Sequence, residues 1–317
     1  MNLHIIEIKH TRMTDKWVFI VNPVAGSGSA TSQLPKLEEM IGKHNLDAEI
    51  IFTKAKGHAS ELSAICLEKG TRYIIGVGGD GTINEIARPL IGKPDVVTGL
   101  IPAGTGNDFI QILGFPNRFG EKDWDMFFRK HTMSMDIGSV NGLIFLNGMG
   151  LGFDAQVAAE NYTKEGRVKE GGKNKYIWHI IKTLLFFREK RMTVIKGDES
   201  HKTDCFINTI AIGRRFAGGF LLTPKALAND GLLDVCSIKK LSLPQRFRIL
   251  LKVPEGKHIN DTKINYFQTP ALTLDFPEPV PFHVDGELYF SDNFKVSLIP
   301  SGVQLIYNPD GPHFFRR

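Results

Sequence analysis

Three glycine-rich segments have residue types that suit phosphate binding. Glycines let backbone N–H groups turn toward one point and let a bulky anion approach closely. Any one of these segments could be a plain turn between a strand and a helix, whereas three in one half of a chain indicate a nucleotide site. The segments are Asn22–Gly28, Gly78–Thr82 and Pro102–Asp108.

The second glycine-rich segment carries a carboxylate, Asp80, between Gly79 and Gly81. A carboxylate among phosphate-binding amides repels the phosphates unless a cation lies between them. The segment therefore favours Mg²⁺ and phosphoryl transfer over hydride transfer. It is not a Walker loop, since no Gly-Lys-Ser/Thr follows a glycine at the required spacing.

Two further carboxylates, Asp285 and Glu287, flank Gly286 near the end of the chain. A kinase acting on an alcohol needs a carboxylate that accepts the hydroxyl proton during attack on the γ-phosphate. Residues two apart on a strand face the same side, so both carboxylates could point into one cleft. Asp-Gly is also a good sequence for a solvated hairpin end, and the pattern alone leaves both interpretations open.

The first half of the chain alternates β-rich runs with amphipathic stretches, which predicts an α/β domain with a parallel sheet and helices on both faces. Ligands of such sheets bind outside the carboxyl ends of the strands, where the glycine-rich segments lie. The predicted strands are Trp17–Val21, Ala48–Phe52, Tyr73–Val77 and Val96–Ile101. The predicted helices are Gln33–His44, Ala59–Lys69 and Ile83–Leu90.

After about Met135 strand patterns dominate, which predicts a second, β-rich antiparallel domain resembling a sandwich. One long helix, Tyr176–Arg188, is predicted within it; its apolar stripe is either core or a membrane-contacting face. The predicted strands are Leu143–Asn147, Met192–Lys196, Asp204–Ile212, Leu232–Ile238, Ile264–Phe267, Leu272–Phe276, Val280–Val284 and Phe294–Leu298.

Composition narrows the class of protein. The 317 residues include 42% hydrophobic and 23% charged residues, as in a globular protein with a developed core. A formal charge of +5 favours anionic phosphates or an anionic membrane surface, and no nucleic-acid motif accompanies it. Three scattered cysteines predict reduced, buried thiols and a cytoplasmic protein. The chain has no run of about 18 uncharged apolar residues, so no transmembrane helix is predicted.

The segment Gly78–Glu85 resembles the signature shared by diacylglycerol, sphingosine and ceramide kinases, and more distantly by NAD kinases and phosphofructokinases. The resemblance extends over nearly the whole chain. Motifs of the lipid kinases, which NAD kinases lack, match Gly218–Pro224, Ala228–Asp234 and Val284–Glu287. Ser29 and Ala30 depart from the pattern, because many members have a basic residue there.

The resemblance implies a phosphofructokinase- or NAD kinase-like domain over residues 1–135, to which residues 301–317 return, and a lipid-substrate domain over 136–300. It implies an active site in the cleft between these domains. It also implies ATP as cofactor, with Asp80 acting through Mg²⁺. The implied ATP-site residues are Asn22, Pro23, Val24, Ala25, Gly26, Thr53, Gly79, Asp80, Gly81, Thr82, Ile83, Asn84, Glu85, Thr105, Asn107 and Asp108.

By the same resemblance, Asp230 would hold a second, structural Mg²⁺ together with the carbonyls of Leu227 and Leu232. The alternative for Asp230 is an ordinary Asp-Gly turn before a strand. Asp80, Asp285 and Glu287 would be the catalytic carboxylates of a kinase that phosphorylates a lipid hydroxyl at the membrane surface. The alternatives are a kinase of a soluble alcohol such as NAD and a catalytically silent regulator. The identity of the lipid and the oligomeric state stay open.

Overall fold

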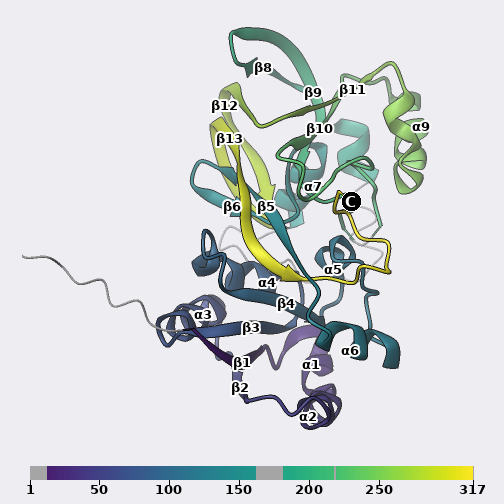
Figure 1. Cartoon of the computed structure of the whole chain (residues 1–317). Helices are drawn as coiled ribbons and strands as arrows, with labels where there is room; N and C mark the ends of the chain where they lie inside the picture. The colour runs from purple at the N-terminus through teal and green to yellow at the C-terminus, as the bar shows by residue number, and fades with distance from the viewer. Residues whose placement is uncertain (1–12, 162–180, 218, 317) are drawn as a thin grey trace, which may run out of the picture. The chain divides into compact units, whose positions relative to one another are not determined.

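The computed structural model describes residues 13–161, 181–217 and 219–316. Its contacts divide the chain into two compact units (Figure 1). The first unit comprises residues up to Thr105, Arg118–Met133 and Val303–Tyr307. The second unit comprises Gly106–Asn117, Ser134–Gly302 and Asn308–Arg317. The family resemblance implies boundaries near residues 135 and 301, and these domain bounds stay a prediction.

A parallel sheet forms the centre of the first unit. Its strands run in the order β2, β1, β3, β4, and the end of β13 pairs in parallel with β4 through Gln304 and Leu305. The strands are β1 (Thr14–Val21), β2 (Ala48–Phe52), β3 (Thr71–Gly78) and β4 (Val97–Pro102). The parallel arrangement predicted from the alternating pattern is therefore observed.

Helices cover both faces of this sheet, because consecutive residues of β1, β3 and β4 are buried and both faces of these strands are therefore apolar. Trp17 of β1 packs against Phe128 of α6 on one face, and Gly99 of β4 leaves room there for Phe127. On the other face Gly76 of β3 lies against Ile86 of α4. The helical segments are η1 (Ala25–Gly28), α1 (Ser29–Ser32), α2 (Leu34–Lys43), α3 (His58–Glu68), α4 (Asp80–Ala87), η2 (Arg88–Leu90) and α6 (Glu121–Phe128).

The second unit is rich in antiparallel strands, as predicted. Its strands pair in the order β11, β10, β9, β7, β12, β13, with β8 beside β9 and β12, and β5 beside β6. The strands are β5 (Thr132–Val140), β6 (Leu143–Phe145), β7 (Gly148–Gly152), β8 (Lys190–Lys196), β9 (Glu199–Ala211), β10 (Leu233–Lys239), β11 (Ile264–Thr269), β12 (Ala271–Val284) and β13 (Glu287–Ile306).

Several elements of the second unit differ from the sequence-based prediction. The two strands predicted around Pro277 form one strand, β12, whose pairing with β13 shifts register between Asp275 and Val280. Strand β7 and helix α9 were not predicted from the sequence. The helical segments are α5 (Asp108–Ile112), α7 (Phe153–Asn161), residues 181–186, α9 (Leu243–Lys252), η3 (Val253–Glu255) and η4 (Lys257–Asn260).

The three cysteines are free and buried, as predicted. Burial raises the pKa of the Cys236 thiol to about 12 and raises the pKa of Cys205 further, so both stay protonated at neutral pH. Within the described residues no helix is both long and apolar enough to cross a membrane. The first part of the predicted helix Tyr176–Arg188, with Trp178, lies outside the described residues.

His258 is a fully buried histidine whose burial lowers its pKa below 6.5. Its Nε2 lies 3.2 Å from the Leu222 carbonyl oxygen and 3.5 Å from the Cys236 sulfur. The folded protein thus binds a proton here less tightly than the unfolded chain does. Its stability contribution is full above pH 6.5 and is lost as the pH falls toward the folded-state pKa.

We expect the wild type to lose more unfolding free energy than His258→Gln between pH 7.5 and 5.5, by up to about 1.4 kcal/mol per pH unit. Urea denaturation at the two pH values measures this difference. Equal losses in both proteins would contradict the assignment, because the other histidines are the same in both.

Candidate active site

The carboxyl ends of β1, β3 and β4 bring the three glycine-rich segments to one edge of the first unit's sheet. The Asn22 N–H donates to the Val77 carbonyl, and Asn22 Nδ2 lies 3.4 Å from Thr82 Oγ1. The N–H groups of Ala103 and Gly104 both donate to the Gly78 carbonyl, at 2.6 and 3.1 Å. Each segment is therefore hydrogen-bonded to a neighbouring one, as the sequence predicted for the edge of a parallel sheet.

Two glycines at this edge are required by close packing. A Cβ on Gly26, whose φ is +54°, would lie 2.1 Å from the Ala103 carbonyl oxygen. A Cβ on Gly78 would lie 2.3 Å from Thr82 Oγ1. Gly26 lets the first and third segments approach one another, and Gly78 leaves room for Thr82 of its own segment, so the presence of these two glycines by itself says nothing about a ligand.

Gly81 is different, because a Cβ at this position would meet nothing within 4 Å. It is exposed, it belongs to the first turn of α4, and its φ is not positive. Neither packing nor backbone conformation requires glycine there. Close approach of an external group to the N-terminal N–H groups of α4 would require it, and such groups favour anions.

Residues of the Gly78–Glu85 signature have distinct surroundings. Thr82, Ile83 and Asn84 are buried, and Ile83 is part of the core. Asp80 begins α4 directly after its N-cap, Gly79, and both are half-buried. The signature thus has its exposed surface at Gly81, while Thr82, Ile83 and Asn84 pack inward.

Glu85 fixes the segment that precedes α3. Its carboxylate accepts the Gly57 N–H at 2.8 Å and the Ala59 N–H at 3.2 Å. These donors lie at the N-terminus of α3, where no intrahelical acceptor exists. Glu85 thereby links the signature to the segment that follows Thr53. The N–H of Thr53 itself donates to the Val21 carbonyl. Thr53 is thus held at the end of β2 beside the end of β1.

The other predicted nucleotide-site residues are spread over both units. Val24 is exposed, and Pro23 and Ala25 are half-buried in the first loop. Thr105 is exposed at the end of the first unit, whereas Asn107 and Asp108 belong to the second unit. Asn107 is buried with a φ of +54°, and its Nδ2 donates to the Asn117 carbonyl. Asn107 therefore supports its own loop.

Asp285 lies in a tight turn, and its carboxylate binds backbone. The side chain accepts N–H groups from Leu146 at 2.7 Å, Asn147 at 3.1 Å and Gly148 at 2.9 Å. These donors are the two residues before β7 and its first residue, about 137 residues earlier in the chain than Asp285. Three such donors hold the carboxylate in one orientation and tie the β12–β13 turn to the start of β7.

The prediction that Asp285 and Glu287 lie on one strand and face the same side was wrong. Val284 pairs with Glu287, and the two residues between them have positive φ values, 45° for Asp285 and 87° for Gly286. This is a two-residue hairpin turn, so the alternation of side chains along a strand does not apply. Glu287, the first residue of β13, accepts a hydrogen bond from the Tyr289 hydroxyl at 2.8 Å. The catalytic role of the pair stays a prediction.

Asp230 lies in the turn before β10. Its Oδ1 accepts the Leu232 N–H at 3.1 Å, and its Oδ2 accepts from Gln268 Nε2 at 3.2 Å. A carboxylate oxygen can accept two bonds, and carboxylate and carbonyl oxygens are the ligands that Mg²⁺ prefers, so this donor set fits such an ion. Within the described part of the chain, no cluster of three acidic, histidine or cysteine side chains could hold a metal. Any ion here would therefore depend on the carbonyls of Leu227 and Leu232.

Sequence analysis missed Asp136, which organises the same region. Its Oδ2 accepts the Gly231 N–H and its Oδ1 accepts the Ser301 N–H, both at 2.8 Å. The side chain is buried, and its own N–H donates to the Ala228 carbonyl. An aspartate between the apolar residues Met135 and Ile137 was the available signal, because a buried carboxylate requires polar partners.

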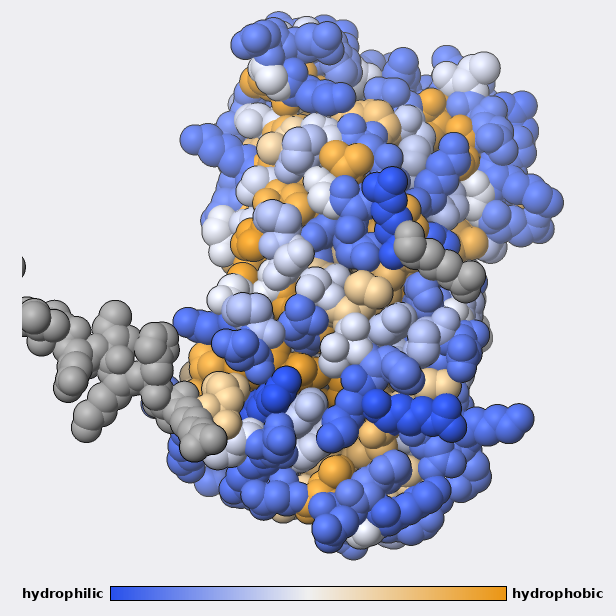
Figure 2. Space-filling view, viewed as in Figure 1, coloured by the Kyte–Doolittle hydropathy of each residue, from blue (hydrophilic) through white to orange (hydrophobic). Residues whose placement is uncertain are grey.

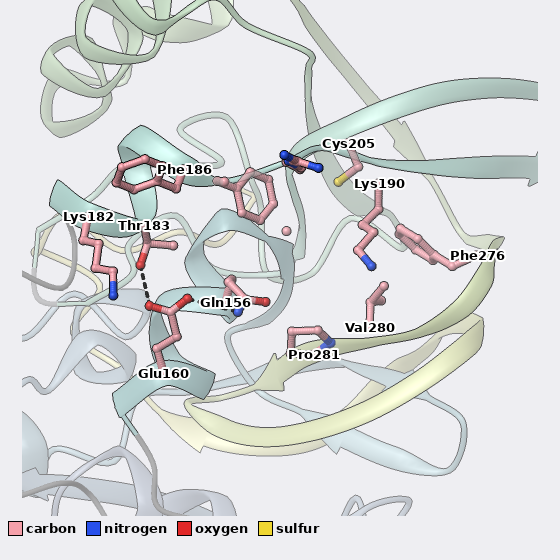
Figure 3. A pocket seen from close by; sticks show the side chains of 13 residues that line it. Gln156, Glu160, Lys182, Thr183, Phe186, Lys190, Cys205, Phe276, Val280 and Pro281 are labelled. Atoms are coloured by element: carbon pink, nitrogen blue, oxygen red, sulfur yellow. Dashed lines mark hydrogen bonds between the residues drawn. The ribbon is translucent and has the colours of Figure 1, made fainter.

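The second unit contains a cavity of about 470 Å³ (Figure 3). Its walls come from α7, the helical residues 181–186 and the strands β8, β9 and β12. Apolar side chains form about half of the lining; three cationic side chains, the carboxylate of Glu160 and the polar side chains of Gln156 and Thr183 form the rest. The apolar lining residues are Phe186, Phe187, Cys205, Phe276, Val280 and Pro281. The cationic residues are Lys182, Arg188 and Lys190.

A histidine–aspartate pair lies two residues from Asp285 along β12. His283 Nε2 lies 3.0 Å from Asp154 Oδ2 of α7. His283 Nδ1 and Asp154 Oδ1 are buried with no hydrogen-bond partner among the described residues. Gly150 makes the pair possible, since a Cβ there would lie 2.3 Å from both His283 Nε2 and Asp154 Oδ2. The pair was not predicted from the sequence.

Comparison with known proteins identifies the class. Residues 16–140 match the diacylglycerol kinase catalytic domain, and residues 148–307 match the YegS C-terminal NAD kinase beta sandwich-like domain. The chain therefore belongs to the YegS-like family of lipid kinases, which joins these two domains. The resemblance derived from the Gly78–Glu85 signature is thereby confirmed.

Individual relatives agree with this assignment. The "Probable lipid kinase YegS-like" of Enterobacter sp. (strain 638) is 31% identical over 82% of this chain and 86% of its own length. The protein of the same name from Shewanella frigidimarina (strain NCIMB 400) is 28% identical over 85% and 86%. A crystal structure of a diacylglycerol kinase from Bacillus anthracis str. Sterne superimposes with a TM-score of 0.71, at 20% identity, over 93% of this chain and 97% of the other. That structure shows the shared fold.

The open space at Gly81 yields a test of the anion site. Gly81→Ala favours the helical backbone of α4 but places a methyl group where an approaching phosphate would lie. We expect ATP affinity to fall at least about tenfold, equivalent to about 1.4 kcal/mol, without loss of thermal stability. Isothermal titration calorimetry without lipid measures the affinity.

Gly42→Ala is the matched control. Gly42 lies in α2 of the same unit, and its Cβ would also meet nothing within 4 Å. This variant should gain stability and keep wild-type ATP affinity. Equal affinity in both variants would show that Gly81 lies away from any nucleotide.

Proposed function

We propose that this protein transfers the γ-phosphoryl group of ATP to the hydroxyl of a lipid such as diacylglycerol or a sphingoid base. The observation that carries this proposal is the cavity of the second unit, part of whose lining is apolar, in a lipid-kinase chain whose first unit presents the Gly81 face of α4. Its volume of about 470 Å³ lies in the range of pockets that bind small molecules, roughly 300–1,000 Å³. A soluble, highly polar alcohol such as NAD would gain little from a lining of Phe186, Phe276 and Val280.

In this proposal the glycine-rich edge of the first unit binds the phosphates of ATP. The N-terminal N–H groups of α4 would meet phosphate oxygens, with Gly81 permitting their close approach. Asp80 would hold Mg²⁺, which when bound neutralises charge that develops on the transferred phosphoryl group. Glu85 would keep the Thr53 segment beside the site through its bonds to Gly57 and Ala59.

We propose different roles for the two carboxylates at the β12–β13 turn. Asp285 is a positioning residue, because its side chain holds the backbone of Leu146–Gly148 against the turn. Glu287 accepts the proton from the lipid hydroxyl as the new O–P bond forms. A carboxylate cannot remove the proton of a weakly acidic alcohol before attack, but general-base assistance during attack contributes about 10² to 10⁴ in rate.

In the cavity, the apolar residues would hold acyl or alkyl carbon. Lys182, Arg188 and Lys190 would attract the anionic phosphate groups of neighbouring lipids or of the product. The lipid would be met at a membrane surface, and the +5 formal charge of the chain suits an anionic one. Such a protein would be cytoplasmic and peripheral on the inner face of the membrane.

The reaction is tested with radiolabelled ATP and Mg²⁺ against diacylglycerol, sphingosine, ceramide and phosphatidylglycerol in mixed micelles, alongside NAD. At least one lipid should be labelled and NAD should not. The variant Val280→Phe, which reduces the cavity, should shift preference toward shorter acyl chains while ATP affinity stays unchanged. Labelled NAD without any labelled lipid would overturn the proposal.

Kinetics and thermal melting together distinguish the role of Glu287 from that of Asp285. Glu287→Gln should lower kcat by about 10² to 10⁴ with an unchanged melting temperature. Asp285→Asn places an amide N–H₂ among three backbone donors and should lower the free energy of unfolding by about 1–3 kcal/mol as well as kcat. Calorimetric melting and steady-state kinetics on the preferred lipid provide both measurements.

Asp292→Asn is the control for charge removal, since Asp292 is an exposed carboxylate of the same strand. It should match the wild type in both measurements. A Glu287→Gln enzyme with wild-type kcat would assign the base elsewhere, and an Asp285→Asn enzyme with wild-type melting would contradict the positioning role.

A further inference from the structure

Helix α9 presents an apolar stripe to solvent. Leu243, Phe247 and Leu251 recur every four residues and are 40%, 45% and 80% exposed. Arg246 and Ile249 form the buried side of the same helix. The stripe adjoins that buried side on the helical wheel, so the apolar arc continues from the core into solvent. Large apolar side chains gathered on one exposed face mark an interaction surface.

Basic side chains border this stripe. Lys239 and Lys240 are exposed at the end of β10, just before the helix begins, and Lys252 lies in its last turn. Arg248 is also exposed, and it pairs with Asp261 at 2.8 Å. An apolar arc with a lysine- and arginine-rich margin is typical of a helix lying in the interface of an anionic bilayer.

Arg246 connects α9 to the cavity. Its guanidinium donates to the Leu184 and Phe187 carbonyls and forms a buried ion pair with Glu189 at 2.7 Å. These acceptors flank Phe186, which lines the cavity and is 74% exposed. Leu184 and Ile249 belong to one hydrophobic cluster, so the cavity wall and α9 pack as one body within the second unit.

A bilayer fits this surface better than a protein partner. Three exposed side chains on a ten-residue helix supply a few hundred Å² at most, whereas a stable protein interface buries about 1,200–2,000 Å². A lipid surface needs only shallow insertion of a few apolar groups, and the lysines add attraction to anionic headgroups. Lys182 and Arg188, which line the cavity, add positive charge to the same unit.

We propose that α9 docks this protein on an anionic lipid bilayer, with Leu243, Phe247 and Leu251 inserted among the acyl chains. Through Arg246, docking holds the Leu184–Glu189 wall of the cavity next to the lipid surface from which the substrate enters. The biological purpose of docking rests on the proposed lipid kinase function, because docking would bring the enzyme to its substrate. The binding itself requires neither ATP nor turnover.

The test is co-sedimentation of the full chain with vesicles of phosphatidylglycerol and phosphatidylcholine, against phosphatidylcholine alone, without ATP or substrate. The wild type should bind the anionic vesicles and release with rising salt. Phe247→Ser with Leu251→Ser should weaken binding at least about tenfold. Lys240→Glu with Lys252→Glu should weaken it at least about fivefold and reduce its salt dependence.

Matched controls come from the first unit. Ile65 is also 45% exposed on a helix, and Lys93 is an exposed lysine. Ile65→Ser and Lys93→Glu should bind vesicles like the wild type. Circular dichroism and melting temperatures show whether each variant is folded, and Leu243→Ser gives a milder change if the double variant does not fold.

Kinase assays separate the docking proposal from the proposed function. A docking variant should lose activity on vesicles but keep activity on a short-chain lipid that is monomeric in solution. If no lipid is labelled and the α9 variants still lose vesicle binding, docking stands and the lipid kinase function fails. Wild-type vesicle binding by folded α9 variants, or no binding by the wild type, overturns the docking proposal whatever the activity.

Discussion

Hydrogen bonds from backbone N–H groups to carboxylates far away in sequence hold several loops near the candidate sites. Glu85 accepts from Gly57 and Ala59, Asp285 from the segment before β7, and Asp136 from Gly231 and Ser301. A loop that leaves regular structure exposes donors that must find acceptors. A carboxylate meets two or three of them at once and bonds them more strongly than a neutral acceptor does. Loop positions at the sites therefore depend on these few acidic side chains.

This dependence concerns Glu85 and Asp285 in particular among the acidic residues of the family signatures. Glu85 and Asp285 bind the protein's own backbone, and their replacement changes the fold around a site before it changes any chemistry. Asp80 is half-buried at the first turn of α4, beside the open face of Gly81, where an external group can approach. A loss of activity after mutation carries a different meaning in each case.

The second unit combines a partly apolar cavity with a cationic border and with exposed apolar side chains. Arg246 and Glu189 form a nearly fully buried ion pair between α9 and the chain that lines the cavity. Removing one partner of such a pair costs about 3–5 kcal/mol, because the other charge stays buried. This pair links α9 to the cavity wall. Hydrophilic residues dominate much of the face of the molecule shown in Figure 2.

The sequence alone determined the parallel sheet of the first unit, the glycine-rich loops at its edge and the family. These features are local: Ile74, Ile75 and Val77 set a strand by their own residue types, and Gly78–Glu85 is contiguous. Helix α9 also had a local signal, since Ser242 and Gln245 form a capping box around Pro244, and this signal was overlooked.

Tertiary structure alone decided which acidic residues bind backbone, because their partners lie up to 165 residues away. It decided that Asp285 lies in a turn, since Asp-Gly suits both a hairpin and a catalytic edge. It also decided that Gly78 serves packing while Gly81 faces open space, although both belong to one signature. Contacts between distant segments are set by the packing of whole elements, and residue type and spacing do not carry that information.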